Sequence, residues 1–319
     1  MQWSGGDDME NQDLHLIVGT GPLGIALMEE LTKRNKRIRM VNRSGQADVP
    51  VEVVKGDATS FESMLEACKG ASVIYHCAKP PYSQWPEKFP SLTRGLIEAA
   101  SALDAKFVYA DNLYMYGPTD KMMTENMSYK ATDVKGRTRA DMAEFIMDAH
   151  HEGKIRATIG RASDFYGPNV LESLLGIQVM KPAIEGKAAY LLGNIDLPHT
   201  FMYIHDFAKG LVMLGEREEA LGEVWHIPSA PTLTVRQMIT MIFKEVNNIP
   251  KHRIASRGLV SFMGLFSKSM KELKDTFYQN EQPFVVDHSK YEKAFGSNIT
   301  PHEIAIKETI EWYKKHVVS

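Results

Sequence analysis

Short β-branched runs alternate with longer amphipathic segments through the first half of the chain. Residues 14–18 form an apolar run, and residues 22–35 carry Leu23, Leu27 and Leu31 at intervals of four, with charged residues between them. This spacing places one apolar stripe along a helix. By the same criteria the sequence predicts strands at 38–41, 51–54, 72–75, 106–109 and 157–159, with helices from Thr59, at 91–102 and at 134–150.

Strands that alternate with helices indicate βαβ units, and therefore a parallel sheet covered by helices on both faces. The alternation weakens after about residue 168, where a mostly helical segment extends to residue 197. Residues 199–214 look like a return to the first layer, and the chain is helix-rich from residue 234. The sequence therefore predicts an α/β fold, with a Rossmann doubly wound parallel sheet over 10–168 and 199–230 and a smaller, mainly helical C-terminal substrate lobe over 169–198 and 231–319.

Two helix starts carry clear sequence signals. Thr59, with Glu62 three residues later, has the pattern of a capping box. Thr300, Pro301 and Glu303 predict a second helix start, with Thr300 as the cap and Pro301 at the first helical position. The buried stripe of that last helix is expected at Ile306, Ile310 and Tyr313.

Composition narrows the class of protein. The 319 residues include 37 Lys and Arg against 40 Asp and Glu, a net charge of −3 that does not suit a general nucleic-acid binder. Cys68 and Cys77 are too few for a disulfide framework and lie outside any zinc-ligand spacing, so we expect no metal site and a reducing, cytoplasmic location. No apolar run approaches the roughly 18 residues of a bilayer-spanning helix, and we expect no membrane partner.

A glycine-rich turn follows the first strand and opens the first helix. It consists of Gly19, Thr20, Gly21, Pro22, Leu23 and Gly24, a G-x-G-x-x-G pattern. The first glycine permits a tight turn, the second lets the backbone approach a pyrophosphate, and the third lets the helix pack close to the strand. The helix N-terminus offers free N–H groups to the phosphates. In this position the pattern predicts a dinucleotide site rather than an ordinary strand–helix turn.

The end of the second strand bears on the choice of dinucleotide. NAD-binding proteins place a carboxylate there, about 20 residues past the glycine turn, whereas this chain has Asn42 followed by Arg43. A guanidinium can pair with the 2′-phosphate of NADP through two hydrogen bonds. We therefore predict NADP as the cofactor, with NAD as the alternative.

Further motifs follow the later strands. They are the segments 56–58, 75–78, 107–117 (which ends in Tyr116 and Gly117) and 161–168. Together with the glycine turn, these segments resemble the extended short-chain dehydrogenase/reductases of the NAD-dependent epimerase/dehydratase family, over nearly all of the chain from Leu14 onward.

The resemblance implies cofactor contacts and an oligomer. Asp57 and Ala58 would contact the adenine, Ala78 and Lys79 would lie beside the cofactor, and Tyr166 would lie against the nicotinamide. The family commonly dimerises through the helices at 91–102 and 134–150, so a homodimer is expected from the resemblance.

The active centre departs from the family pattern. The resemblance implies a Tyr general acid/base, a Lys four residues later, and a Ser or Thr that orients the substrate. In this chain the three positions hold Lys135, Arg139 and Asn112, and Tyr129 is followed four residues later by Asp133. The usual Tyr-x-x-x-Lys site is therefore absent.

Other side chains could supply the proton that carbonyl reduction requires. Lys135 would serve if burial and Arg139 lowered its pKa, and Asn112 could donate to a developing oxyanion. Tyr114 offers a phenol on the same loop, and Asp164 is a further catalytic candidate on the facing segment. The alternative for Lys135 and Arg139 is a solvated helix face.

Three residues are expected to contact the substrate: Tyr116, Asp164 and His199. Asp164 with Tyr166 offers a carboxylate–phenol pair, although a satisfied turn carboxylate and a structural Tyr116 are the alternatives. His199 occupies the position where nucleotide-sugar members of the family carry an Arg that grips the diphosphate. A neutral imidazole is a weaker diphosphate clamp, so a smaller carbonyl or alcohol suits the site as well as a sugar nucleotide.

Two functions follow from these observations. The first is an NAD(P)-dependent oxidoreductase or epimerase with a degenerate Tyr-x-x-x-Lys site, whose partner is a small-molecule carbonyl, alcohol or sugar-like substrate. The second is a catalytically silent NADP(H)-binding redox sensor or regulatory protein. We predict the first, with the second as the alternative.

Overall fold

The computed structural model describes residues 13–81, 84–263 and 276–318, which divide into two compact units. The first unit holds the described residues of 1–111, 141–160 and 208–224, and the second holds those of 112–140, 161–207 and 225–319. These boundaries differ from the predicted ones. The second unit includes four segments that were expected in the first domain: 112–140, 161–168, 199–207 and 225–230.

Backbone and apolar contacts explain the different boundary. Met123 N donates to Val285 O at 2.8 Å, and Met123 forms a bridge with Val286. Leu113, Met115 and Phe284 belong to one buried cluster with these residues. Such long-range contacts join 112–140 to the C-terminal part of the chain, and the local sequence pattern carries no sign of them.

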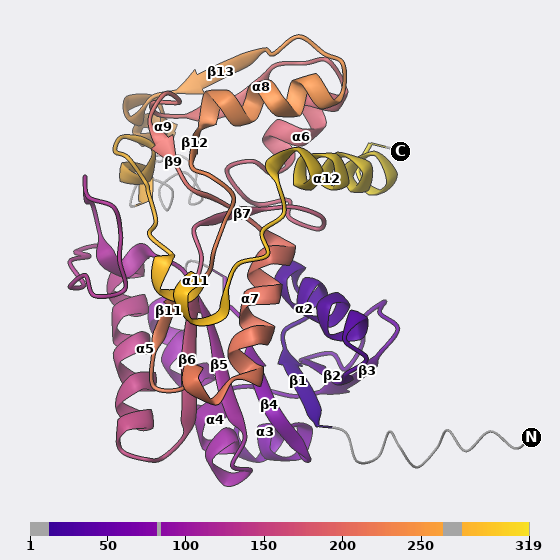
Figure 1. Ribbon diagram of the computed structural model, residues 1–319, viewed down its shortest axis with the longest axis vertical. Helices are drawn as coiled ribbons and strands as arrows, with labels where there is room; N and C mark the ends of the chain where they lie inside the picture. The colour runs from indigo at the N-terminus through magenta and orange to yellow at the C-terminus, as the bar shows by residue number, and fades with distance from the viewer. Residues whose placement is uncertain (1–12, 82–83, 264–275, 319) are drawn as a thin grey trace, which may run out of the picture. The chain divides into compact units, whose positions relative to one another are not determined.

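The main sheet has seven strands in the order β11-β6-β5-β4-β1-β2-β3 (Figure 1). Its strands are β1 (Leu14–Val18), β2 (Arg37–Asn42), β3 (Glu52–Lys55), β4 (Ala71–His76), β5 (Lys106–Asp111), β6 (Arg156–Arg161) and β11 (Val224–His226). Strand β1 pairs in parallel with β2 and β4, and the pairs β2–β3 and β4–β5 are also parallel. The predicted Rossmann-like α/β fold is confirmed.

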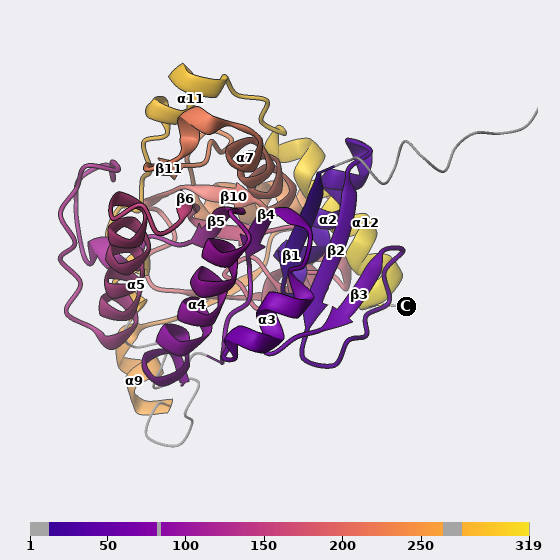
Figure 2. The same ribbon diagram turned by 90° about the horizontal axis from the view of Figure 1, so that it is seen from below.

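Helices cover both faces of this sheet. Figure 2 shows α3, α4 and α5 along one face and α2 and α7 along the other. Their bounds are α2 Pro22–Lys33, α3 Phe61–Ala67, α4 Trp85–Ala102, α5 Val134–His151 and α7 Ile204–Glu216, with a 3₁₀ turn η3 at Glu218–Ala220. Helix α4 begins six residues before its predicted start and contains Pro90.

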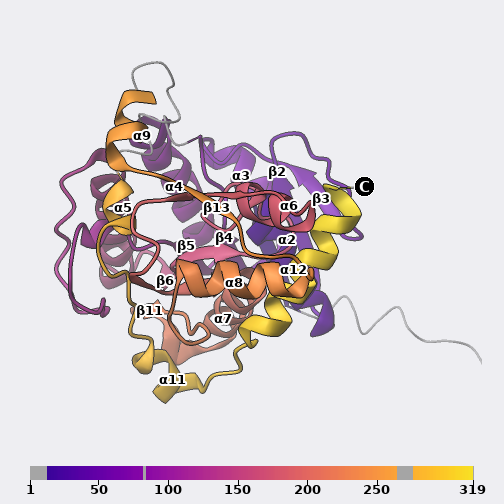
Figure 3. The same cartoon turned by 90° about the horizontal axis from the view of Figure 1, so that it is seen from above.

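The second unit is built around α6, α8 and α12, whose apolar faces form one buried cluster (Figure 3). Its helices are α6 Ile177–Ile184, α8 Val235–Glu245, α9 Arg257–Met263, α11 Ser289–Phe295 and α12 His302–His316, with 3₁₀ turns η2 Tyr114–Tyr116 and η4 Phe277–Asn280. Short strands pair within it: β7 (Asp164–Tyr166) with β10 (Phe201–Tyr203), β8 (Ala189–Leu192) with β13 (His252–Ala255), and β9 (Pro198–His199) with β12 (Leu233–Thr234).

The prediction of a mostly helical segment from 168 to 197 is wrong. Helix α6 covers eight residues, and strand β8 follows it. The helix ends because Gly186 adopts a φ of +68°, and Lys187 N then bonds back to Pro182 O at 2.8 Å. A left-handed glycine of this kind is a common helix stop.

Two predicted caps are also wrong. Ser60, not Thr59, caps α3 through its bond from Ser63 N, while the Thr59 hydroxyl donates to Asp57 Oδ1 at 2.7 Å. Thr300 does not cap α12, whose N-cap is Pro301. The hydroxyls of both threonines donate to carboxylates, and Asp206 also accepts a bond from Thr300 N. The predicted stripe Ile306, Ile310 and Tyr313 is confirmed as buried.

Among the helices of the described residues, none combines the length and the apolar character that a bilayer crossing requires. In the same residues, no group of three or more His, Cys, Asp or Glu side chains is placed to hold a metal ion.

Candidate functional site

The glycine turn after β1 is shaped by two close backbone approaches. Gly19 has a φ of +114°, and a Cβ there would lie 3.0 Å from Ala78 N. A Cβ on Gly24 would lie 2.0 Å from Gly19 O, inside any possible contact distance. Both positions therefore require glycine, in agreement with the turn and packing roles expected for the first and third glycines.

Gly21 lies in different surroundings. It is exposed, and a Cβ there would meet no heavy atom within 4 Å. Gly21 is also the N-cap of α2, and the first turn of that helix contains Pro22 and no acidic residue. An open backbone at the positive end of a 12-residue helix suits an anionic group such as a pyrophosphate.

Asn42, at the end of β2, organises the next loop. Its amide donates to Thr20 Oγ1 at 3.1 Å and to Gln46 O at 2.8 Å, and its Oδ1 accepts from Gly45 N at 2.7 Å. These bonds tie the glycine turn to the loop that carries the exposed side chain of Arg43. Asn42 is thus a loop-building residue, and Arg43 is the side chain that faces solvent.

Asp57 and Ala58 follow β3. Hydrogen bonds from the backbone and hydroxyl of Thr59 hold the pKa of the Asp57 carboxyl below its ordinary value, and the charge of Arg43 adds to this effect. Ala78 and Lys79 follow β4, where Cys77 N bonds to Val18 O at 3.0 Å. Apart from Tyr166, every predicted cofactor residue therefore lies in the first unit, after the carboxyl ends of β1 to β4, where parallel sheets bind ligands.

The predicted catalytic residues lie in the second unit. Asn112 follows β5 directly, and its Oδ1 accepts from Tyr114 N at 3.1 Å, which fixes the start of η2. A Cβ on Gly136 would lie 2.6 Å from Tyr114 O, so glycine allows the first turn of α5 to approach this loop. The oxygen of Asn112 is thus used in the loop, and its amide N–H groups are the part suited to a substrate oxygen.

Lys135 and Arg139 are buried, with exposed fractions of 7% and 6%. They stand four residues apart on α5 and therefore on one face of that helix. Their burial does not fit the solvated helix face considered above.

Tyr116 and Arg161 form the centre of a buried polar network. The Arg161 guanidinium donates to Tyr116 Oη at 2.8 Å and to Tyr129 Oη at 2.6 Å, and it lies over both rings. His226 Nε2 is 2.8 Å from Tyr116 Oη, while His226 Nδ1 is 2.9 Å from Asp287 O. Because a carbonyl only accepts, the proton is on Nδ1, and Tyr116 donates to Nε2. Tyr116 thus has the environment of a structural residue.

His226 makes stability depend on pH. Burial, with the charge of Arg161, lowers the pKa of His226 from 6.5 to about 3. The unfolded chain binds this proton near pH 6.5 and the folded chain does not, so stability present above pH 6.5 is lost as the pH falls. We expect His226 to contribute about 2 kcal/mol less to the free energy of unfolding at pH 5 than at pH 7.

Urea unfolding at both pH values measures this effect. His226→Gln should lower stability at pH 7 and show a smaller loss between pH 7 and pH 5 than the wild type does. His15, whose pKa burial lowers to about 4, contributes to both proteins alike. An unchanged pH dependence in the variant would contradict the assignment.

Asp164 and Tyr166 have separate partners rather than each other. Asp164 Oδ2 is 3.0 Å from His199 Nε2, and Tyr166 Oη is 3.1 Å from His302 Nδ1. Tyr166 is fully buried, and burial raises the pKa of its phenol above the ordinary value. The structure therefore joins two predicted substrate residues, Asp164 and His199, into one hydrogen-bonded pair.

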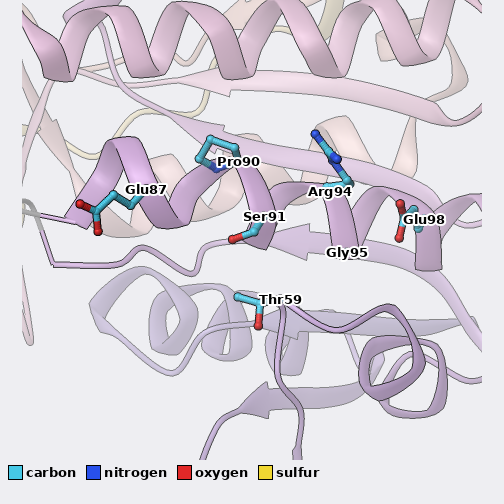
Figure 4. A pocket seen from close by; sticks show the side chains of 7 residues that line it. All are labelled: Thr59, Glu87, Pro90, Ser91, Arg94, Gly95 and Glu98. Carbon is cyan, nitrogen blue, oxygen red and sulfur yellow. The ribbon is translucent and has the colours of Figure 1, made fainter.

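Two hollows lie elsewhere. One of about 300 Å³ runs along α4, and Figure 4 shows its lining residues Thr59, Glu87, Pro90, Ser91, Arg94, Gly95 and Glu98. The other, of about 520 Å³, lies in the second unit between Trp225 and α11. Neither is lined by a predicted site residue.

The family model of the NAD dependent epimerase/dehydratase family matches residues 16–227. The chain belongs to this family. The resemblance drawn from the glycine turn and the later motifs is thereby confirmed.

Proteins similar to the chain are named for different substrates. The chain is 24% identical over 256 residues to the sterol-4-alpha-carboxylate 3-dehydrogenase, decarboxylating, of Bos taurus, over 75% of this chain and 71% of that protein. The dTDP-glucose 4,6-dehydratase of Bacillus anthracis, solved with NAD, has a TM-score of 0.79 at 17% identity and covers 95% and 97% of the two chains. The UDP-glucuronic acid 4-epimerase of Bacillus cereus, also solved with NAD, has a TM-score of 0.78 at 17% identity. The match covers 95% of this chain and 99% of that chain. The two solved structures support the fold alone.

Three buried polar residues of the second unit could not be identified as functional or structural centres from the sequence: Arg161, His226 and His302. Arg161 stood at the start of a recognised segment, yet nothing in a single sequence shows that Tyr116 and Tyr129 converge on its guanidinium. His226 and His302 gave no signal beyond their residue type, because their partners lie 110 and 136 residues away in the chain.

Proposed function

We propose that the protein is an NAD(P)-dependent oxidoreductase or epimerase that acts on a secondary alcohol or on the corresponding carbonyl compound. The single observation that carries this proposal is the glycine turn, where two glycines are required by close backbone contact and the third is left open at a helix N-terminus. Such a turn has a clear use if the exposed backbone binds a pyrophosphate. Membership of the family supports the same conclusion.

The residues after β1 to β4 would hold the dinucleotide. The backbone from Gly21 to Gly24 would bind the pyrophosphate, Arg43 the adenosine ribose, and Asp57 with Ala58 the adenine. When bound, the nicotinamide group accepts or returns a hydride. Lys135, Asn112 and Tyr114 are the candidates for orienting the substrate oxygen, through N–H or O–H donation.

The proposed cofactor is NADP, with NAD as the alternative. The side chain of Asn42 is hydrogen-bonded within the loop. The end of β2 therefore has no carboxylate that could accept a hydrogen bond from a ribose hydroxyl. Arg43 is exposed beside it. A guanidinium in this position favours a 2′-phosphate.

Replacing Arg43 tests this choice. In Arg43→Ala we expect the Kd of NADPH to rise about tenfold, the equivalent of one charge-assisted contact, while the Kd of NADH changes little. Fluorescence titration of both reduced nucleotides measures it, with Arg37→Ala as an exposed control in β2. Equal effects on the two nucleotides would contradict the preference for NADP.

The proposed substrate carries no diphosphate. The position where the nucleotide-sugar members of the family would carry an Arg holds His199, whose Nε2 is engaged by Asp164. A carboxylate at this place repels a phosphate rather than binding it. The relative named as a sterol-4-alpha-carboxylate 3-dehydrogenase supports an alcohol that carries no diphosphate.

Turnover with a substrate panel tests the whole proposal. Neutral secondary alcohols and ketones are offered with each nucleotide, with UDP- and dTDP-sugars alongside. We expect oxidation or reduction of the nucleotide with a neutral compound. Tight nucleotide binding without turnover of any compound would instead support the silent sensor.

A further inference from the structure

The second unit contains a hydrogen-bonded carboxylate–imidazole pair, Asp164 and His199. Asp164 lies on β7, which pairs with β10 in the register Asp164 to Phe201, and His199 lies on β9, which pairs with β12. Both side chains therefore start from hydrogen-bonded backbone. This placement gives the pair the fixed geometry that a site on regular strands provides.

The imidazole of His199 is locked in place. Its ring stacks on Phe284 at a centroid distance of 5.0 Å and lies 4.7 Å from the ring of Phe201. Its side chain is 4% exposed, and its Nε2 lies 3.0 Å from Asp164 Oδ2. Because an ionised carboxylate only accepts, Nε2 carries the proton and donates to Asp164.

Asp164 is the open member of the pair. Its side chain is 27% exposed, and within residues 13–81, 84–263 and 276–318 its Oδ1 accepts no hydrogen bond. The charge of Asp164 also reaches the phenol of Tyr278, whose pKa is raised to about 12, mainly by burial. One carboxylate oxygen is thus held by His199, and the other is available to a ligand.

A carboxylate can also supply the proton acceptor that the absent tyrosine would have provided. Oxidation of an alcohol requires a group that accepts the hydroxyl proton. Of the candidates Asn112, Tyr114, Lys135, Arg139 and Asp164, only Asp164 is a carboxylate. An amide and a guanidinium cannot take up a proton at neutral pH, and an ordinary phenol must first lose its own, whereas a carboxylate accepts a proton directly.

We propose that Asp164 is the catalytic base that replaces the absent tyrosine, and that His199 is its positioning residue. The inference rests on the proposed oxidoreductase function. The substrate O–H proton passes to Asp164 Oδ1, the C–H bond breaks with its electron pair transferred as hydride to the oxidised nicotinamide dinucleotide, and the alcohol carbon becomes a carbonyl. In the reverse direction Asp164 returns the proton to the oxygen.

The first experiment compares kcat and KM. Asp164→Asn keeps the shape and an acceptor for His199 but cannot take a proton, so we expect kcat to fall about 10²–10⁴-fold, with KM and the Kd of NADPH within about threefold. Asp196→Asn is the matched control, because Asp196 is an exposed carboxylate paired with Arg236. It should keep wild-type kcat.

The second experiment tests His199. Gln carries an N–H near the position of Nε2, and Phe carries none. His199→Gln should therefore keep kcat within about tenfold of wild type, whereas His199→Phe should lose about 100-fold. In the protein without nucleotide, ¹⁵N NMR of the imidazole should show the proton on Nε2, and Asp164→Ala should remove this preference.

The outcomes separate the two proposals. Wild-type turnover together with an unchanged kcat in Asp164→Asn, or a change in KM alone, overturns the role of Asp164 and leaves the proposed function standing. A proton on His199 Nδ1 in the free protein overturns the positioning role. Absence of nucleotide binding by the wild type overturns the proposed function itself, and the base with it.

Discussion

Gly24→Ala is expected to destabilise the protein by about 1–3 kcal/mol and to weaken dinucleotide binding about 100-fold. The new Cβ would lie 2.0 Å from the carbonyl oxygen of Gly19 and 3.0 Å from its carbonyl carbon. Both atoms belong to the backbone, so rotation of a side chain cannot relieve the clash. Either α2 or the turn must move, and the turn then loses the shape that a pyrophosphate requires.

Urea unfolding and nucleotide titration of Gly24→Ala measure the two effects. Gly258→Ala is the control, because Gly258 is an exposed glycine of α9 with its nearest contact at 3.8 Å. Alanine there should raise stability by up to about 1 kcal/mol through helix propensity. If Gly24→Ala had wild-type stability and wild-type nucleotide binding, the requirement for glycine at position 24 would be contradicted.

Arg161→Met should cost about 3 kcal/mol of unfolding free energy. Arg161 is fully buried, and its loss removes the donors to Tyr116 and Tyr129 together with two cation–π contacts. Charged hydrogen bonds and buried cation–π contacts contribute about 1–3 kcal/mol each, before relaxation. The loop that carries Asn112 and Tyr114 would also lose its anchor.

Arg257→Met is the matched control for this change. Arg257 pairs with Glu281 and lies over the ring of Phe277, but it is exposed. An exposed ion pair of this kind contributes at most about 1 kcal/mol. Equal losses in the two variants would show that burial does not strengthen the Arg161 network.

The sequence alone supports most of the first unit. Its strands and helices have strong periodicity, and the glycine turn lies where strand and helix patterns meet, so both the sheet and the dinucleotide site follow from local signals. Helix starts were predicted less well than helices and strands themselves. Thr59 and Thr300 have good capping patterns, yet the N-caps are the next residues, Ser60 and Pro301, and the two threonine hydroxyls donate to Asp57 and Asp206.

The second unit depends on contacts that are distant in the chain. The pairing of Asp164 with His199 and the convergence on Arg161 join residues 32 to 45 positions apart, and His226 lies 110 residues from Tyr116. A single sequence contains the residue types but not these distances. The candidates could therefore be named from the sequence, while their partners could not.

A titration of wild type and Gly21→Ala with NADPH and NADH tests the central claim most directly. The alanine Cβ has free space, so the fold should keep its stability within about 1 kcal/mol. Its methyl group would occupy the place of the pyrophosphate. We predict saturable binding by the wild type and binding about 100-fold weaker in Gly21→Ala. Equal binding by both proteins, or none by the wild type, would contradict the account.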